Sequence, residues 1–596
     1  MTINVKLPRP GAAALCVLAA CACAANMGAY FGAAWGGMLS FLCCLLLLLL
    51  ALLLRPKAKE AIACGLSGGV FSLMHTLGYS YDTIDSYGLI LKSTATLLRG
   101  ALCMISLGLV AACVCLLLVR LLDALRDGCA RRGDADVRER KRLFFLSAGL
   151  IFLGSVPYLL LYWPGLNIFD THDQLLQFYG YPSYIGDGSA LSDHHPVFLT
   201  VVYAAFMKMG LLLGDVNIGQ AAYSLISMAA LSAAWAYALC TLYDLGLKKK
   251  ACLIMAAFVA LYPVLALYAF NMCKDVSAAP FVLLYACQML KIHRSEGAVM
   301  RDKRFMLAVF ANAFVLMLTR KPSMYALAFA SVFLIIRYRG VRMRIAAALL
   351  GAVTLFYVGY SSLLLPALGV IPGETREMLS IPFQMTARYL NTYPDDVTQE
   401  ELDAVARVLD LESVGNYDPR LSDPVKDTSN PELGGGNLSA YLKAFVSMGL
   451  RHPGVYLDAW LNMIYGYFYP SDSNTIVCLT LNSPDQGGMN LVQDAALDDL
   501  RLEFHDFVYY TLRRLPGAGM LFYVNTVSWA FLLLLAYAVL RGGIGEACPW
   551  MFFFGTLGIC LLSPKSGEIR YLMPILYALP IMLGAVILPE EEDVKA

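Results

Sequence analysis

One polar stretch, residues 163–196, holds an unusual concentration of side chains that can accept or donate protons. It reads WPGLNIFDTHDQLLQFYGYPSYIGDGSALSDHHP and lies between long apolar runs. Two groups of ionisable residues stand in it: Asp170, His172 and Asp173 near the start, and Asp193, His194 and His195 near the end. Carboxylates and imidazoles are the commonest general acids and bases in enzymes, so this stretch predicts proton-transfer chemistry.

Charged residues also occur in three short passages far away in the sequence. These passages are NMCKD with Lys274 and Asp275, TRKPS with Arg320 and Lys321, and SPKSGEIRYLMP with Lys565, Glu568, Arg570 and Tyr571. Charges beside apolar segments are costly in lipid and usually face a helix bundle or a wet cavity. Each one could also be an ordinary charge that reaches from a segment end into water.

Together, these groups suit the transfer of a group away from a lipid-linked phosphate. Asp170 could take a proton from an attacking hydroxyl as a general base. Cationic side chains from the three distant passages could stabilise the charge that builds on a departing phosphate.

Two structural alternatives apply to the 163–196 stretch itself. Asp170 and Asp173 share a face if FDTHDQLLQFYG is helical, but Asp170 could instead be the N-cap of a helix that begins just after it. The His194 and His195 pair could simply satisfy backbone groups in a loop. Adjacent side chains diverge and no spacing supplies a third ligand, so any metal site is unknown and a Mg²⁺ or Mn²⁺ requirement stays open.

Composition sets the environment in which these residues act. Of the 596 residues, 59% are hydrophobic and 15% are charged, whereas soluble domains have roughly 45–50% and about 25%. We therefore expect an all-α, polytopic protein of the plasma (inner) membrane. The net charge of +1 gives no reason to expect a nucleic-acid partner. Many of the seventeen cysteines lie inside apolar runs, where they act as small hydrophobic residues.

Apolar segments long enough to cross a bilayer, about fourteen in all, can be placed along the chain. We place them near residues 11–33, 36–54, 61–79, 98–122, 143–163, 217–242, 251–270, 276–292, 304–319, 323–337, 344–366, 517–540, 549–563 and 571–588. The N-terminus resembles a signal peptide, but the apolar character continues through Leu54, so we expect an uncleaved first span.

The basic loops predict the orientation of these spans. Their residues are 55–59, 120–142, 248–250, 291–304 and 337–344. All of them fall on one side if the apolar run 197–213 lies along the outer surface without crossing. That side is cytoplasmic by the positive-inside rule, with both termini in the cytoplasm. The charge pattern therefore favours a non-crossing helix at 197–213 and places the 163–196 stretch outside.

The apolar pattern stops between about residues 367 and 515, where we predict a mixed or mainly helical extracytoplasmic domain. An acidic segment at 396–412 has helical character, and 452–470 is rich in the aromatic residues that favour a membrane surface. The expected organisation is thus 1–142 as additional N-terminal spans with a basic loop, 143–366 as a transmembrane core with the outer loop 164–196, 367–515 as the outer domain, and 516–596 as the last spans with an acidic cytoplasmic tail.

The arrangement resembles the GT-C superfamily of integral membrane glycosyltransferases. The likeness rests on an Asp in the first large outer loop, a His-Pro pair some two dozen residues later that opens an apolar helix, and the late RYLMP element. It is closest to the protein mannosyltransferase and aminoarabinose transferase branch and covers roughly residues 143–390 and the last spans. The Lys274-Asp275 pair and the TRKPSMYAL passage resemble bacterial relatives of unassigned function.

By this resemblance, the donor would be a polyprenyl-phosphate-linked sugar and the acceptor an envelope glycan, lipid or protein. Asp170 would be the catalytic base, and His195 and Pro196 would shape the acceptor side. The second acidic position of many relatives has no clear match, with Asp173 and Asp193 both open. The substrate-binding residues would come from His194, Lys274, Asp275, Arg320, Lys321, Glu568, Arg570 and Tyr571.

Other classes of protein remain compatible with the sequence. A transporter or flippase of a lipid-linked or anionic precursor could use the same outer charges, although it should show two related halves and the chain shows no such symmetry. A polysaccharide polymerase or ligase would differ mainly in its acceptor. A structural or sensory membrane protein would tolerate replacement of Asp170.

Overall fold

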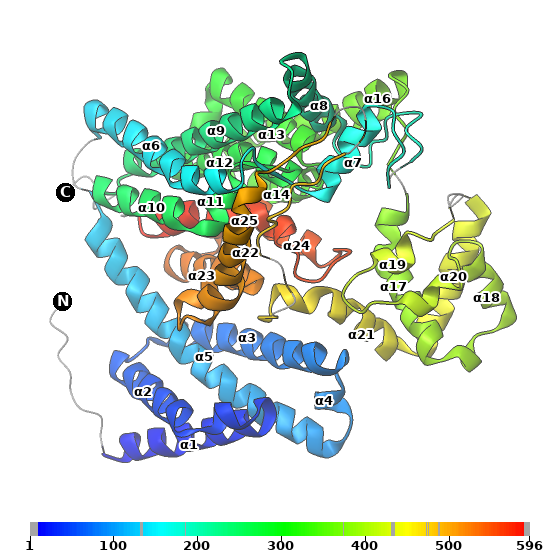
Figure 1. Ribbon diagram of the computed structural model, residues 1–596. Coiled ribbons are helices and arrows are strands. Elements are labelled where there is room, and N and C mark those ends of the chain that lie inside the picture. Colours follow the sequence, from blue (N-terminus) through cyan, green and yellow to red (C-terminus); the bar gives the residue numbers. More distant parts are fainter. Residues whose placement is uncertain are drawn as a thin grey trace.

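The structure is a computed structural model that describes residues 10–131, 135–184, 186–373, 375–430, 435–471, 474, 476–484, 486 and 489–588. In these ranges nearly all regular structure is helical (Figure 1). Within the described residues, nine helices are long and apolar enough to cross a membrane, and four shorter apolar helices accompany them. The prediction of an all-helical, multi-pass membrane protein is therefore confirmed. The basic N-terminus and the acidic C-terminal tail lie outside the described residues.

Every predicted apolar segment coincides with one helix or with two or three consecutive helices. The first five helices are α1 Pro10–Phe31, α2 Met38–Leu54, α3 Ala58–Ile84, α4 Gly88–Leu91 and α5 Thr94–Cys129. The central helices are α6 Val137–Leu161, α9 Val216–Asp244, α10 Lys249–Leu261, α11 Pro263–Tyr268, α12 Lys274–Arg294, α13 Lys303–Thr319, α14 Ser323–Arg337, α15 Arg342–Thr354, the π-helix η4 Leu355–Leu364 and α16 Leu365–Ala367. The last are α23 Val524–Gly542, α24 Met551–Cys560 and α25 Ile569–Val586.

The predicted basic loops gather at one end of the helix bundle, here called the basic end. Ion pairs join them there: Glu60 with Arg120 and Arg541, Arg140 with Asp244, Lys249 with Glu139, His293 with Glu546, and Arg337 with Glu296. Because these residues come from the ends of α3, α5, α6, α9, α10, α12, α14 and α23, the helices share a common boundary. The opposite end is called the site end.

The apolar run after His195 forms α8, Val197–Leu212, which starts and finishes at the site end. α9 follows it directly, and two side chains near the start of α9 contact the 164–166 segment. Gln220 donates to the Leu166 carbonyl (3.2 Å) and Ser224 donates to the Pro164 carbonyl (3.0 Å). The far end of α9 reaches the basic end through the pair of Asp244 with Arg140 (2.8 Å). α8 itself is held at the site end by Gln174, which donates to Thr200 (2.9 Å), and by Tyr179, which donates to the Ala204 carbonyl (3.1 Å). Its non-crossing placement in a membrane stays a prediction.

α8 can fold back on α9 because glycines stand at their crossing. A Cβ at Gly219 would lie 2.2 Å from the Phe206 carbonyl oxygen, which belongs to the backbone and cannot swing away. We expect Gly219→Ala to lower the free energy of unfolding by about 1–3 kcal/mol, since overpacking forces the helices apart. Thermal unfolding in detergent would measure this effect. Gly69→Ala in α3, where nothing lies within 4 Å, is the control, and equal destabilisation of both variants would contradict the account.

Residues 375–430 and 435–451 form a separate helical lobe at the site end. Its elements are η5 Thr375–Leu379, α17 Ser380–Thr392, η6 Pro394–Asp396, α18 Gln399–Ala406, η7 Ser413–Asn416, α19 Asp423–Lys426 and α20 Gly435–Arg451. The lobe has its own hydrophobic core, built from residues such as Phe383, Val405 and Tyr441. The acidic segment predicted as helical over 396–412 is shorter in the structure, where α18 ends at Ala406.

The chain returns from the lobe through α21 Pro453–Ile464 and η8 Tyr465–Tyr467. Polar groups of this aromatic passage pair inside the protein, and its position at a bilayer surface stays a prediction. Asp458 accepts a hydrogen bond from the Tyr81 hydroxyl of α3, and Tyr467 donates to Ser563 before α25. Further short helices complete the site end: η9 Ala495–Leu497, α22 Asp498–Asp506, the π-helix η10 Phe507–Thr511, η11 Leu512–Arg514 and η12 Ala518–Phe522.

Candidate active site

A two-strand parallel pairing brings the start of α7, Phe169–Phe178, beside the start of α12. β1, Leu166–Asn167, pairs with β2, Asn271–Met272. The Thr171 hydroxyl of α7 also donates to the Met272 carbonyl. Since Asp170 and Lys274 follow the two paired strands by only two or three residues, the pairing sets them side by side.

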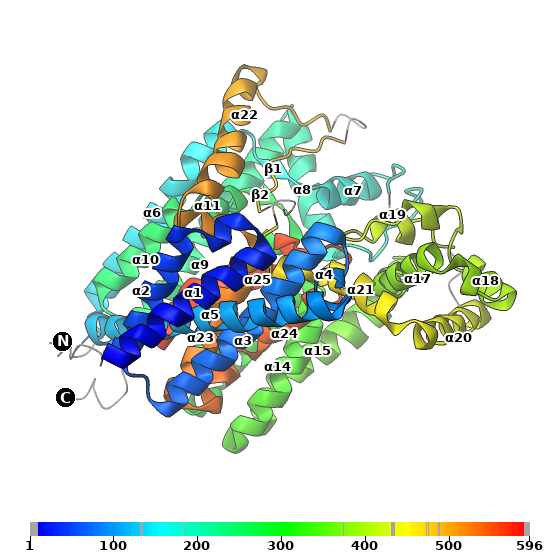
Figure 2. The same cartoon turned by 90° about the horizontal axis from the view of Figure 1, so that it is seen from below.

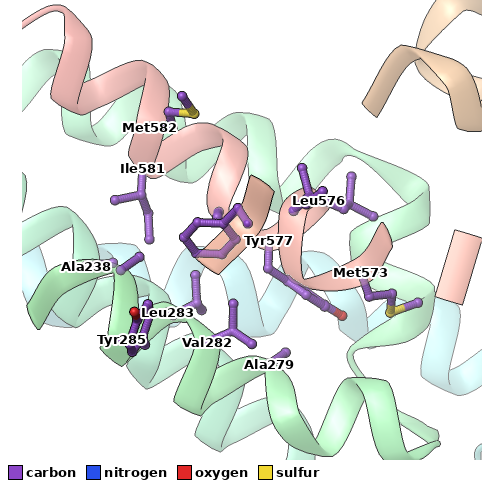
Figure 3. Packing of buried hydrophobic residues seen from close by; sticks show 14 of the residues in the cluster. Ala238, Ala279, Val282, Leu283, Tyr285, Met573, Leu576, Tyr577, Ile581 and Met582 are labelled. Carbon is purple, nitrogen blue, oxygen red and sulfur yellow. The ribbon is translucent and has the colours of Figure 1, made fainter. Parts of the chain in front are cut away.

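The third element of the site is α25, which packs along α12. Figure 3 shows Ala279, Val282 and Leu283 of α12 facing Tyr577 and Ile581 of α25 in the buried core. Both helices begin at the site end, so their first turns lie together. Lys274 is the first residue of α12 and Arg570 is the second of α25. The Glu568 side chain caps α25 by accepting from the Arg570 backbone N–H (3.4 Å).

These elements converge on the Asp170 carboxylate. Its Oδ2 lies 2.8 Å from Lys274 Nζ, 3.0 Å from Arg570 Nη1 and 4.0 Å from His195 Nδ1. Lys274 Nζ also lies 3.3 Å from His195 Nδ1. An ammonium group can only donate, so His195 Nδ1 accepts from it and the imidazole proton belongs on Nε2. The Asp170 side chain is 19% exposed, which keeps the carboxylate within reach of a substrate.

The surrounding charges fix the protonation states in this cluster. Burial of the Asp170 carboxylate works against ionisation, but the Arg570 and Lys274 charges outweigh it and hold the pKa of Asp170 well below its usual range. Burial, helped by the Lys274 charge, lowers the pKa of His195 well below its usual range. Burial also lowers the pKa of His194 to about 4. At neutral pH the carboxylate is therefore ionised and both imidazoles are neutral.

The cluster can still attract an anion and accept a hydrogen bond from a hydroxyl group. Glu568 pairs with Lys565 (2.8 Å) and lies 3.5 Å from Arg570 Nε, so the three cations and two carboxylates leave one net positive charge. The contacts of Asp170 with Lys274, Arg570 and His195 given above all involve Oδ2. Oδ1 accepts no hydrogen bond among the described residues and could accept one from a hydroxyl, beside cations that would attract a phosphate.

Arg320 and Asp275 lie inside the bundle and pair with each other. Arg320 Nε donates to Asp275 Oδ1 at 2.8 Å, and their side chains are only 2% and 3% exposed. Arg320 Nη2 also donates to the Tyr571 carbonyl of α25 (3.2 Å). This pair ties α12, α13 and α25 together behind the cluster, and it contacts Tyr571 through the backbone.

Asp193 and Lys321 form a second pair beside the cluster. Lys321 Nζ lies 3.0 Å from Asp193 Oδ2 and also donates to the Asp193 carbonyl. Burial raises the pKa of Asp193 despite Lys321, and burial lowers the pKa of Lys321. The His194 ring packs edge-to-face against His195, with ring centroids 4.6 Å apart. These residues support the loop that carries His195.

The first turn of α7 decides between the two alternatives for Asp170. Ile168 is the N-cap residue and no side chain caps the helix, so Asp170 is not the N-cap. Asp173 lies on the buried side of α7, and the basic group nearest to it is His172 Nδ1 at 3.8 Å. Asp173 therefore stands apart from the Asp170 cluster.

A metal ion does not fit the residues that are present. In the part of the chain that the structure describes, no group of three or more His, Cys, Asp and Glu side chains is placed to hold one. The Asp170 carboxylate is already engaged by two cations, which would repel a divalent ion. The residues of this site therefore offer no place for Mg²⁺ or Mn²⁺.

Two features of the site lie beyond what the sequence predicts. The sequence indicates Lys565 as an outer charge without a role, and the structure makes it the partner of Glu568. The β1–β2 pairing has no detectable signal, because two residues are too short for a strand pattern.

The fold and the site define a multi-pass helical membrane protein with a charged cluster at one end of its bundle. A family model described as a family of unknown function (DUF6020) matches residues 181–595, and the chain belongs to this family. No curated protein and no solved structure matches the chain. The matched region contains Lys274, Arg570 and His195, whereas Asp170 precedes it.

Proposed function

We propose that the protein is a GT-C-like glycosyltransferase that moves a sugar from a polyprenyl-phosphate donor to an envelope acceptor. The observation that carries the proposal is Asp170, an ionised carboxylate with Oδ1 open, held between Lys274 and Arg570. A base beside two cations suits a reaction in which a hydroxyl loses a proton while a phosphate leaves.

The proposed reaction follows from this arrangement. The acceptor hydroxyl gives its proton to Asp170 Oδ1 and its oxygen bonds to the anomeric carbon of the sugar. The bond from that carbon to the phosphate oxygen breaks, and its electron pair leaves with the polyprenyl phosphate. Lys274 and Arg570 stabilise the charge that grows on this phosphate. Neutral His195 accepts from Lys274 and holds its ammonium group in place.

Donor binding would also prepare the base. In the substrate-free protein, both cations stabilise the Asp170 carboxylate and make it a weak base. A donor phosphate that shares Lys274 and Arg570 would reduce this stabilisation and raise the proton affinity of Asp170. The same two cations would thus couple donor binding to activation of the acceptor.

The proposed topology has fourteen crossings in the plasma (inner) membrane. The basic end would face the cytoplasm by the positive-inside rule, with both termini on that side. The site end and the helical lobe would then face outward, where lipid-linked sugars are used to build the envelope.

Replacing Lys274 tests the role of the cations. We expect Lys274→Gln to raise the KM for the polyprenyl-phosphate sugar by about 10–100-fold, because a charge-assisted contact to the phosphate is lost. The measurement is transfer of a radiolabelled sugar in vesicles at varied donor concentrations. Lys208→Gln on the exposed side of α8 is the matched control. An unchanged donor KM in Lys274→Gln would remove the phosphate-binding role.

The protonation states predict a flat pH profile. We expect kcat/KM to change less than about twofold between pH 5 and 8, because this ratio reports groups of the free enzyme. The pKa of Asp170 lies well below this window and that of His194 is about 4, so neither titrates within it. Since the pKa of Asp170 is depressed, its active ionised form is lost only on further acidification. A limb near pH 6 to 7 would show that a histidine titrates and would contradict the assigned states.

A further inference from the structure

One edge of the helical lobe is apolar and uncovered. α20 buries Tyr441 and Met448 in the core of the lobe. Its other side exposes Leu442, Val446 and Leu450, whose exposed fractions are 41%, 55% and 78%. Residues four apart lie on one face of a helix, so the three side chains form a continuous stripe.

The charges of the lobe are distributed unequally about this helix. α20 contains no Asp or Glu, and Lys443 is exposed beside the stripe. The acidic residues of the lobe lie in the 395–412 segment. Glu401 and Asp396 pair with Arg451 at the end of α20 (2.7 and 3.3 Å), whereas the other acidic residues are exposed: Asp395, Glu400, Asp403, Asp410 and Glu412. Figure 2 shows α20 along the lower edge of the lobe, with α17 and α18 above it. The outward-facing side of α20 thus combines an apolar stripe with the exposed Lys443.

The C-terminal end of the stripe, at Leu450, lies close to a membrane-spanning helix. Leu450 precedes Gly454 by four residues, and a Cβ at Gly454 would lie 2.6 Å from the Tyr87 hydroxyl. Asp458 of α21 accepts from the Tyr81 hydroxyl (2.7 Å) and from the Tyr87 N–H (3.1 Å). Tyr81 lies in the last turn of α3, one of the helices able to span a membrane. The end of α20 is thus tied to the place where α3 leaves the bilayer.

We propose that α20 lies on the membrane leaflet at the site end, with Leu442, Val446 and Leu450 inserted among the lipid chains. An apolar stripe flanked by a lysine and free of acidic residues is the pattern of a helix that binds in the interface plane. Lys443 would contact lipid phosphates, while exposed acidic residues such as Glu400 and Asp403 face water. The contact would hold the lobe at a fixed height beside the site. This inference is independent of the reaction.

Accessibility of single positions tests the proposal in the full-length protein. The variants Val446→Cys on α20 and Asp403→Cys on α18 are reconstituted at one copy per nanodisc of phosphatidylcholine and phosphatidylglycerol, with the wild type as background. We expect a water-soluble maleimide to react with position 446 at least about tenfold more slowly than with position 403. A nitroxide at position 446 should collide more often with oxygen than with a water-soluble nickel chelate, because oxygen concentrates in lipid.

Three outcomes would overturn the proposal. Equal maleimide rates at both positions would show that the stripe faces water. Exclusion of both oxygen and the nickel chelate in single-copy discs would show that the protein itself covers the stripe. Protection that arises only in discs with two copies would assign the stripe to a contact between copies. Activity is not part of the readout, so failure of the proposed reaction leaves this test unaffected.

Discussion

Asp170→Asn is expected to reduce sugar transfer by about 10³-fold or more, since a general base contributes roughly 10²–10⁴-fold and an amide cannot accept the proton. The substitution keeps the size of the side chain, but the neutral amide no longer offsets the charges of Lys274 and Arg570. Donor phosphate should therefore bind at least as well as before. The expected signature is a large fall in kcat without an increase in the donor KM, measured by transfer of a radiolabelled sugar in vesicles of matched protein content.

The control for this prediction lies in the same polar stretch. Asp187 is exposed, and its carboxylate accepts from the Ser189 backbone N–H in a local turn. Asp187→Asn should transfer sugar at the wild-type rate. If Asp170→Asn retained transfer within about twofold of Asp187→Asn, Asp170 would have no role as the base.

Arg320→Ala is expected to lower the free energy of unfolding by about 3–5 kcal/mol, because removing one partner of a buried pair leaves the other charge uncompensated. The stranded group would be Asp275, which is 3% exposed and accepts from Arg320 Nε at 2.8 Å. The α25 backbone would also lose the bond from Arg320 to the Tyr571 carbonyl. Chemical or thermal unfolding in detergent would measure the loss.

Two further variants separate this effect from substrate binding. The double variant Arg320→Met with Asp275→Leu should recover most of the lost stability, since an apolar pair of similar volume leaves no buried charge. Arg337→Ala removes the exposed pair with Glu296 and should cost less than about 1 kcal/mol. If Arg320→Ala folded normally and raised only the donor KM, Arg320 would be a phosphate ligand and its structural role would be wrong.

The positions of the helices could be predicted from the sequence because each is a long apolar run. The charge pattern also predicts that residues 197–213 stay at one end of the bundle. Gln174 and Tyr179, which follow Asp170, donate to Thr200 and to the Ala204 carbonyl of α8 at that end. The break at Tyr262 follows from Pro263, which lacks a backbone N–H and begins a new helix.

The composition of the site could be predicted only in part. The sequence predicts that Asp170, Lys274, Arg570 and His195 act together, and they meet in the structure. Neighbours in sequence are harder to assign, because consecutive helical residues point about 100° apart. Lys274 therefore faces Asp170, whereas Asp275 faces Arg320.

The sequence could not show which carboxylate accompanies Asp170. It leaves Asp173 and Asp193 both open, and the structure places neither in the cluster. Asp173 turns to the buried side of α7, and Asp193 pairs with Lys321. Glu568, which the sequence places among the binding residues, is the acidic group linked to the cluster through Arg570. The packing of α25 on α12 brings Glu568 to the cluster. No local sequence pattern predicts this contact, because the two helices are far apart in the chain.

The most direct test of the proposed function follows the fate of the lipid donor. Purified wild-type protein is reconstituted in liposomes with donors labelled separately in the sugar and in the polyprenyl phosphate, together with extracted envelope acceptors. The account predicts that the sugar label moves to the acceptor while free polyprenyl phosphate appears in equal amount. An intact donor that only changes leaflets would contradict the account and would indicate a flippase that uses the same cations to bind an anionic headgroup.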